Sequence, residues 1–227
     1  MTKRRDNRSN SEKYSRQKTN TAIIACGNLK NEIEILRNGD TRVDVHYLDE
    51  ELHTTPEKIA ANIQTKIDAV KTTSGRIVLG YGLCSCGTIG VMAPEQGLWI
   101  PRVHDCVALY LGSRADYDRQ FKFCPGTYYL TEAWIRNNRD PLGIVEKDYA
   151  PRFGYDEALW AMQQQLKHYA RIAFINTQVS RETKDSAVLK RAKENTERLN
   201  KELEVLTINT DFFERILFGP YSQEEFV

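Results

Sequence analysis

The sequence lacks several features that would assign it quickly to a class of protein. No apolar run approaches the length of a membrane-spanning helix. The N-terminus has none of the apolar core of a secretory signal peptide. These absences predict a cytoplasmic protein that crosses no membrane.

Motifs for nucleotide binding and for serine hydrolysis are also missing. Gly80, Gly82 and Gly87 do not have the spacing of a dinucleotide-binding fingerprint, and the acidic partner is absent. The chain contains no Gly-Lys-Ser/Thr phosphate loop and no nucleophile elbow of a serine triad. The sequence therefore does not support the use of NAD or ATP.

Residues 1–20 have almost no apolar side chains and hold most of the excess positive charge. Seven Lys or Arg residues against two acidic ones give this segment +5, which leaves −4 on the rest of a chain whose net charge is +1. Such a composition predicts a disordered, solvated tail. The alternative is a basic tail that touches nucleic acid or anionic lipid, although the mildly acidic body makes nucleic acid an unlikely main partner.

The remaining residues, 21–227, alternate between strand-like and helix-like patterns. Runs rich in β-formers stand at residues 21–26, 43–47, 76–79, 98–100, 127–130, 172–175 and 205–208. Apolar stripes at helical spacing separate most of them. This alternation predicts one α/β domain with a mostly parallel open sheet and helices on both faces, in a Rossmann-like or flavodoxin-like three-layer arrangement.

Two later segments offer surface for a partner. Residues 137–155 contain two prolines and two glycines among scattered charges, which predicts an irregular connection or lid. Ser180 is a candidate N-cap for a long charged helix over residues 181–203.

The clearest chemical feature is the placement of the cysteines at the edges of predicted strands. They are Cys26, Cys84, Cys86, Cys106 and Cys124. Ligands of open α/β sheets bind outside the carboxyl ends of the strands, and in a reducing compartment clustered cysteines favour metal binding or catalysis over disulfides. We therefore expect Cys26, Cys84 and Cys106 to converge on one site. The alternative for each is a small buried hydrophobic residue.

Neighbouring residues could complete such a site. The spacing Cys84-Ser85-Cys86 is weak evidence alone, because zinc knuckles have a gap of two residues. His104 or Cys86 could supply a fourth ligand, and His104 could equally orient a ligand through a hydrogen bond. The other histidines, His46, His53 and His168, stand in polar contexts and look ordinary.

Glycines and carboxylates near the cysteines have candidate roles as well. Gly80, Gly82 and Gly87 are expected to bring the backbone close to a bound cofactor. Asp105 and Glu132 are the nearest candidates for acid–base catalysis. The alternative for Asp105 is the N-cap of a helix over residues 106–111, whose first turn would favour a thiolate on Cys106.

Several short motifs together resemble one protein family. They are Ala25-Cys26, Tyr81-Gly82-Leu83-Cys84 followed by Gly87, Asp105-Cys106 with Leu111-Gly112, and Gly126-Thr127-Tyr128-Tyr129-Leu130-Thr131. The set resembles a prokaryotic family of unknown function whose members are often encoded beside corrinoid-dependent methyltransferases for methylamines and related compounds. The resemblance runs from about Thr21 to the C-terminus. Cys86 stands where a polar residue such as asparagine is expected, and Cys124 falls outside the motifs.

The first functional hypothesis is a metal-binding protein. Cys26, Cys84 and Cys106 would hold zinc or an iron–sulfur cluster, with His104, Cys86 or an exogenous ligand in a fourth place. The resemblance implies a setting in or beside corrinoid-dependent methyl transfer and one-carbon metabolism. It also implies a corrinoid protein or methyltransferase as partner and a small thiol or methylated compound as substrate.

The second hypothesis needs no metal. Cys106 would be the nucleophile of a redox or sulfur-handling protein, and Cys84 or Cys86 would be its resolving thiol. A non-catalytic accessory module of a methyltransferase system is the third possibility.

Overall fold

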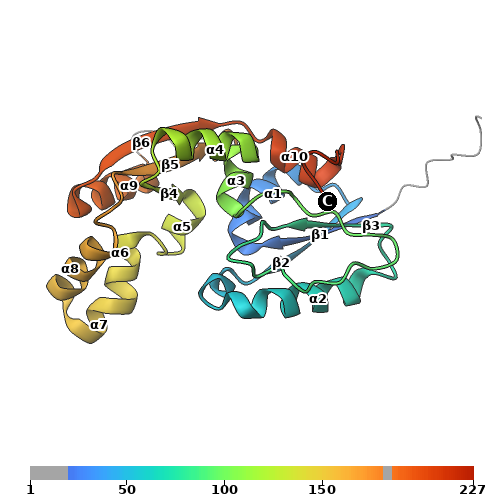
Figure 1. Ribbon diagram of the computed structural model, residues 1–227, viewed down its shortest axis with the longest axis horizontal. Helices are drawn as coiled ribbons and strands as arrows, with labels where there is room; N and C mark the ends of the chain where they lie inside the picture. Colours follow the sequence, from blue (N-terminus) through green and yellow to red (C-terminus); the bar gives the residue numbers. More distant parts are fainter. Residues whose placement is uncertain (1–19, 181–185) are drawn as a thin grey trace, which may run out of the picture.

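The structure, a computed structural model, describes residues 20–180 and 186–227. Its strands form two parallel three-stranded sheets, ordered β2-β1-β3 and β4-β5-β6 (Figure 1). The predicted α/β class is confirmed, but the strands lie in two sheets rather than in one. The disorder predicted for residues 1–20 falls, except at Asn20, outside the described residues.

The first sheet is built by the N-terminal part of the chain. Its elements are β1 (Thr21–Cys26), η1 (Gly27–Leu29), α1 (Lys30–Arg37), β2 (Val43–Leu48), η2 (Glu50–Thr54), η3 (Pro56–Lys58), α2 (Ile59–Val70) and β3 (Arg76–Gly80). The central strand β1 is buried along its whole length because both neighbours pair with it. The stripe predicted on α2 faces this core through Ile59, Ile63, Ile67 and Val70.

The chain changes sheets between β3 and β4. The strand predicted at residues 98–100 forms only an isolated bridge, between Trp99 and Val78. After it come α3 (Cys106–Leu111) and α4 (Arg114–Phe123), and then β4 (Thr127–Thr131) pairs with β5 instead of β3. A long loop and two helices therefore replace the single crossover that would have continued the first sheet.

The second sheet belongs to the C-terminal part of the chain. Its further elements are α5 (Glu132–Arg136), α6 (Pro141–Ile144), the π-helix η4 (Val145–Tyr149), α7 (Ala150–Phe153), α8 (Tyr155–Gln165), β5 (Arg171–Thr177), α9 (Ala187–Leu199), β6 (Glu202–Ile208) and α10 (Asp211–Phe218). The segment predicted as irregular, residues 137–155, thus consists largely of consecutive short helices. The helix predicted after Ser180 begins at Ala187, and Ser186 caps it by accepting a hydrogen bond from the Leu189 N–H.

The last helix returns to the first sheet. Phe212, Phe213, Ile216 and Leu217 of α10 are buried in the same core as β1 and β3, and α10 lies beside α1 in Figure 1. Further along, Val227 exchanges two backbone hydrogen bonds with Ile100. The C-terminal segment therefore ties the two sheets together.

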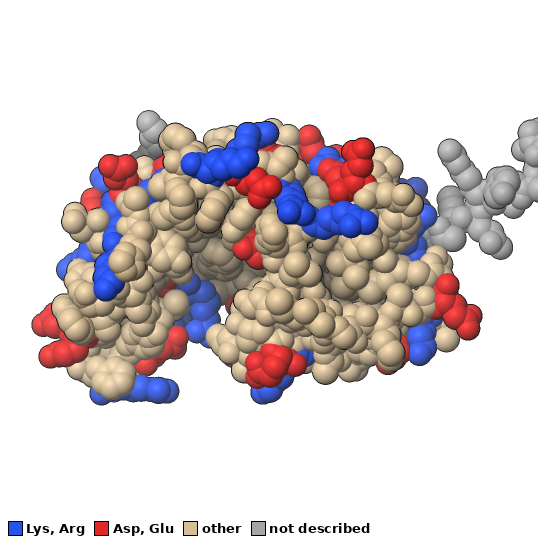
Figure 2. Space-filling view, viewed as in Figure 1, with Lys and Arg blue, Asp and Glu red and all other residues tan. Residues whose placement is uncertain are grey.

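A hollow separates the two sheets on one side of the molecule (Figure 2). A volume of about 290 Å³ is lined by residues from η1 and η2 on the first side, and by Tyr128, Trp134 and Arg139 on the second. Two short bonds cross this region, from Asn137 to Glu50 (2.6 Å) and from Arg139 to Glu51 (2.5 Å). Within the described residues, no helix is both long and apolar enough to cross a membrane.

Candidate metal centre

Three side chains from separate elements meet at the carboxyl edge of the first sheet. Cys26 ends β1, His53 lies in η2 directly beyond β2, and Cys106 begins α3. One ligand atom from each lies within 4.8 Å of the other two, and the Cys26 Sγ is 3.1 Å from the His53 Nε2. These three residues are close enough to hold a metal ion.

Cys84 lies next to this group. Its Sγ is 3.5 Å from the Sγ of Cys106, and both thiols are buried. The backbone fixes this approach, because the Leu83 N–H donates to the Val103 oxygen (3.2 Å) and the Cys84 N–H to the His104 oxygen (3.0 Å). The three cysteines that were predicted at strand ends therefore lie close together in the structure.

Two features of the loop after β3 permit this packing. A Cβ at Gly82 would lie 2.7 Å from the backbone nitrogen and Cα of Asp105, so only glycine fits without movement. Cys84, Ser85 and Cys86 then follow with φ of 44°, 58° and 64°, three left-handed residues in succession that are not glycine. At Gly80 and Gly87 too, an added Cβ would clash with other residues of the protein. The close packing at these glycines is therefore against the protein itself.

The three thiols of the cluster differ in their pKa values. The Cys106 thiol donates to Cys26, and this bond with that of His53 lowers the pKa of Cys26 to about 5 despite its burial. Cys106 has one S–H, and when it donates to Cys84 instead of Cys26 it lowers the pKa of Cys84. Hydrogen bonds to Cys26 and Cys84, together with burial, raise the pKa of Cys106. The thiolate that was predicted on Cys106 is thus favoured on Cys26, or on Cys84 when Cys106 donates to that sulfur.

The negative charge on these sulfurs shifts the pKa of two neighbouring groups, His53 and Tyr81. The hydrogen bond to Cys26 raises the pKa of His53, so a thiolate–imidazolium pair is favoured. Burial, and then the charge on Cys26, raises the pKa of Tyr81. The Tyr81 hydroxyl is buried and has no well-aligned hydrogen-bond partner among the described residues.

The other residues that the sequence singled out lie outside the group of three. His104 is exposed, and its ring lies 5.9 Å from that of Tyr117. Cys86 is exposed, and Cys124 is half-buried at the end of α4. Glu132 forms an ion pair with Arg136 on the same helix.

Asp105 caps α3, which was the alternative expected for it. Its Oδ1 accepts hydrogen bonds from the N–H groups of Val107 (3.0 Å) and Ala108 (3.2 Å). This cap fixes the first turn of the helix, and therefore the position of Cys106 within it.

His53 is the site residue that sequence reasoning missed. It was grouped with the ordinary histidines because its neighbours are polar and it belongs to no periodic pattern. A signal was nevertheless present, since His53 follows the carboxyl end of β2 by five residues. Applying the strand-end argument to β2 as well as to β1 and β3 would have included it.

Comparison with known families gives one match. The model of a family described as a protein of unknown function, DUF1638, matches residues 47–217. The chain belongs to the DUF1638 family. Curated proteins and solved structures yield no match to the chain.

The DUF1638 match confirms the resemblance to a family of unknown function and begins later than about Thr21. It covers His53, Cys84 and Cys106 and leaves Cys26 before its first residue. The chemistry of this DUF1638 chain is therefore inferred from the site itself. The site consists of a nitrogen and several sulfurs, most of them buried, at the wall of a hollow.

Proposed function

We propose that the protein binds one zinc ion through Cys26, His53 and Cys106, with a fourth position for Cys84 or for a substrate thiol. The observation that carries the proposal is the mutual approach of the three ligand atoms to within 4.8 Å. Thiolate sulfur and imidazole nitrogen are preferred donors of zinc. The histidine favours zinc over an iron–sulfur cluster, since most such clusters are held by four cysteines.

Backbone strain at the cysteine loop supports this proposal. Each left-handed residue that is not glycine costs on the order of 1–2 kcal/mol. Three in succession at Cys84, Ser85 and Cys86 need a compensating interaction. Structural zinc binding contributes about 10–16 kcal/mol in zinc-finger peptides, and it would offset that cost where Cys84 is the fourth ligand.

Access to the site supports a role beyond structure. The three cysteines of the cluster are buried, whereas His53 is exposed and lines the hollow of about 290 Å³ with Glu50 and Trp134. Structural zinc sites are closed, and catalytic ones keep a position for a ligand. A small thiol entering this hollow would approach the metal from the side of His53.

The proposed setting is corrinoid-dependent methyl transfer in one-carbon metabolism, and its support is the family resemblance. Zinc would keep a substrate thiol as the thiolate. The sulfur of this thiolate would form a bond to the methyl carbon of the corrinoid on a partner protein. The cobalt–carbon bond would break, and cobalt would keep the electron pair. The test is the rate at which a small thiol demethylates methylcobalamin, measured by absorbance with and without the zinc-loaded protein. We expect the protein to raise this rate. An unchanged rate with the zinc-loaded protein contradicts it.

The 3.5 Å contact between the Cys84 and Cys106 sulfurs favours a second candidate, a metal-free dithiol. The two thiols would give two protons and two electrons to a disulfide substrate. A Cys84–Cys106 disulfide would form, and the substrate would be reduced to two thiols.

Metal analysis of anaerobically purified protein separates the candidates. We expect about one zinc per chain, lost in Cys26→Ser, Cys106→Ser and His53→Ala. Cys124→Ser is the matched control, because that thiol lies outside the group, and it should keep the metal. Substoichiometric zinc and iron, together with five titratable thiols, would overturn the zinc proposal and leave the dithiol.

A further inference from the structure

A second hollow lies beside the candidate metal centre, between α4, β4 and the start of α3. Its volume is about 380 Å³, within the range of about 300–1,000 Å³ typical of small-ligand sites. Six aromatic side chains line it: Tyr117, Phe121, Tyr128, Tyr129, Trp134 and Tyr169.

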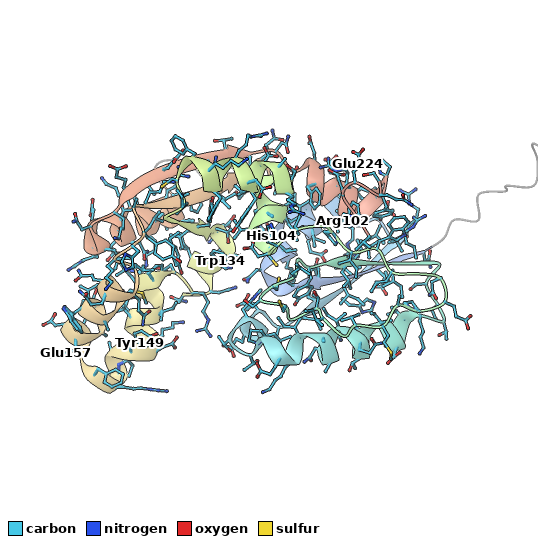
Figure 3. The ribbon with its side chains drawn as sticks, viewed as in Figure 1. Arg102, His104, Trp134, Tyr149, Glu157 and Glu224 are labelled. Atoms are coloured by element: carbon cyan, nitrogen blue, oxygen red, sulfur yellow. The ribbon has the colours of Figure 1, made fainter. Side chains whose placement is uncertain are left out.

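The rings hold one another in place. Tyr128 and Tyr169 meet edge to face with centroids 5.7 Å apart, and Tyr117 lies 6.5 Å from Tyr129. Trp134 lies on α5, on the side that faces the first sheet (Figure 3). Four of the six rings are therefore held by ring contacts within the protein, which favours a preformed site.

Among the described residues that line this hollow, Asp105 alone has a charged side chain. One of its oxygens caps α3, and its negative charge acts on the Tyr117 hydroxyl. Arg171 lies behind the strand, where its Nε donates to the hydroxyl of Thr127 in the lining (2.7 Å) and its charge is paired with Glu204. The described part of the lining thus combines electron-rich ring faces with one carboxylate and includes no Lys or Arg.

We propose that this hollow binds a small organic cation with a methylated ammonium group. Ring faces attract cations, most strongly when water is excluded, and the methyl groups of such a cation also make apolar contacts with the rings. The carboxylate of Asp105 adds an opposite charge and disfavours anions. The inference goes beyond the zinc site and does not require it.

The hollow also adjoins the metal centre. Tyr128 and Trp134 line both this hollow and the smaller one that reaches His53. Asp105 directly precedes Cys106 in the chain. A cation held here would therefore lie beside the cysteine cluster.

Calorimetric titration of the full chain with two matched probes tests the proposal. Choline is the cation, and 3,3-dimethylbutan-1-ol is its uncharged isostere. We expect choline to bind about tenfold more tightly or better, the ratio that a desolvated cation–ring contact provides. Equal affinity for the two probes, or no heat of binding with choline, would overturn the proposal.

Variants locate the binding. Trp134→Leu and Asp105→Asn should each weaken choline binding about tenfold, and Asn keeps the helix cap while it removes the charge. Trp160→Leu is the matched control, because Trp160 is exposed on α8 outside the hollow. If Trp134→Leu fails to fold, Asp105→Asn still decides. Wild-type affinity in Asp105→Asn, or in a folded Trp134→Leu, overturns the proposal.

Loss of zinc in Cys26→Ser should leave the affinity for choline unchanged. The zinc proposal and the cation proposal can therefore fail separately.

Discussion

A single methyl group at Gly82 should damage the candidate metal centre without changing any cysteine. The Cβ of Gly82→Ala would lie 2.7 Å from the backbone of Asp105, whereas ordinary contact begins at 3.4 Å. The two segments must therefore separate by about 0.7 Å. This exceeds the tolerance of about 0.2 Å in metal–ligand distances, and it falls on the segments that carry Cys84 and Cys106.

The energetic cost sets the expected effect. Overpacking of this kind costs about 1–3 kcal/mol, so zinc affinity should fall about tenfold to a hundredfold. Competition with a chromophoric chelator measures the affinity, and a thermal melt of the zinc-free protein measures stability.

Gly39→Ala is the control for backbone effects. Gly39 has φ of 75°, and its added Cβ would meet no atom within 4 Å. That variant should lose about 1 kcal/mol of stability through its left-handed conformation and keep its zinc affinity. Zinc affinity in Gly82→Ala equal to that of the wild type would refute the reasoning.

The remaining predictions concern the ligands and one buried carboxyl. The double variant Cys26→Ser/Cys106→Ser should hold no less zinc than either single variant, because one missing ligand already empties the site; independent, additive losses would argue against a shared metal. His53→Cys should retain zinc where His53→Ala loses it, since thiolate also binds zinc; equal loss in both, by metal analysis, would show that His53 is not a ligand. Burial raises the pKa of Glu32 from 4.5 to about 7, so between those pH values the folded protein keeps a proton that the unfolded chain has lost. Stability should therefore fall by about 3 kcal/mol as pH rises from about 4.5 to about 7, and Glu32→Gln should lack this fall; the same pH slope in both proteins, by urea unfolding, would contradict the assignment.

Strand ends were the part of the candidate site that could be predicted from the sequence. Cys26 and Cys84 follow apolar β-rich runs, and the carboxyl ends of parallel strands share an edge, so their approach follows from local pattern and topology alone. Cys106 was also placed correctly at the start of a helix, because Asp105 is a strong N-cap. His53 sits on a short 3-10 turn with no periodicity, so its position beyond the end of β2 was the signal that could have indicated it.

Contacts distant in the sequence explain the main differences in the fold. Residues 137–155 read as irregular because proline and glycine are poor helix formers. Their helices depend on Asp140, which is buried and bonded to Arg191 (2.9 Å) and Asn195 (2.6 Å) of α9. The division into two sheets likewise depends on which strand β4 pairs with, and no local pattern determines that choice.

X-ray absorption at the zinc edge of anaerobically purified protein tests the central claim most directly. The account predicts zinc bound by at least two sulfurs at about 2.3 Å and by an imidazole nitrogen at about 2.0 Å. In His53→Cys, the nitrogen shell should be replaced by sulfur. A zinc-free protein, or zinc coordinated by oxygen and nitrogen alone, would contradict it.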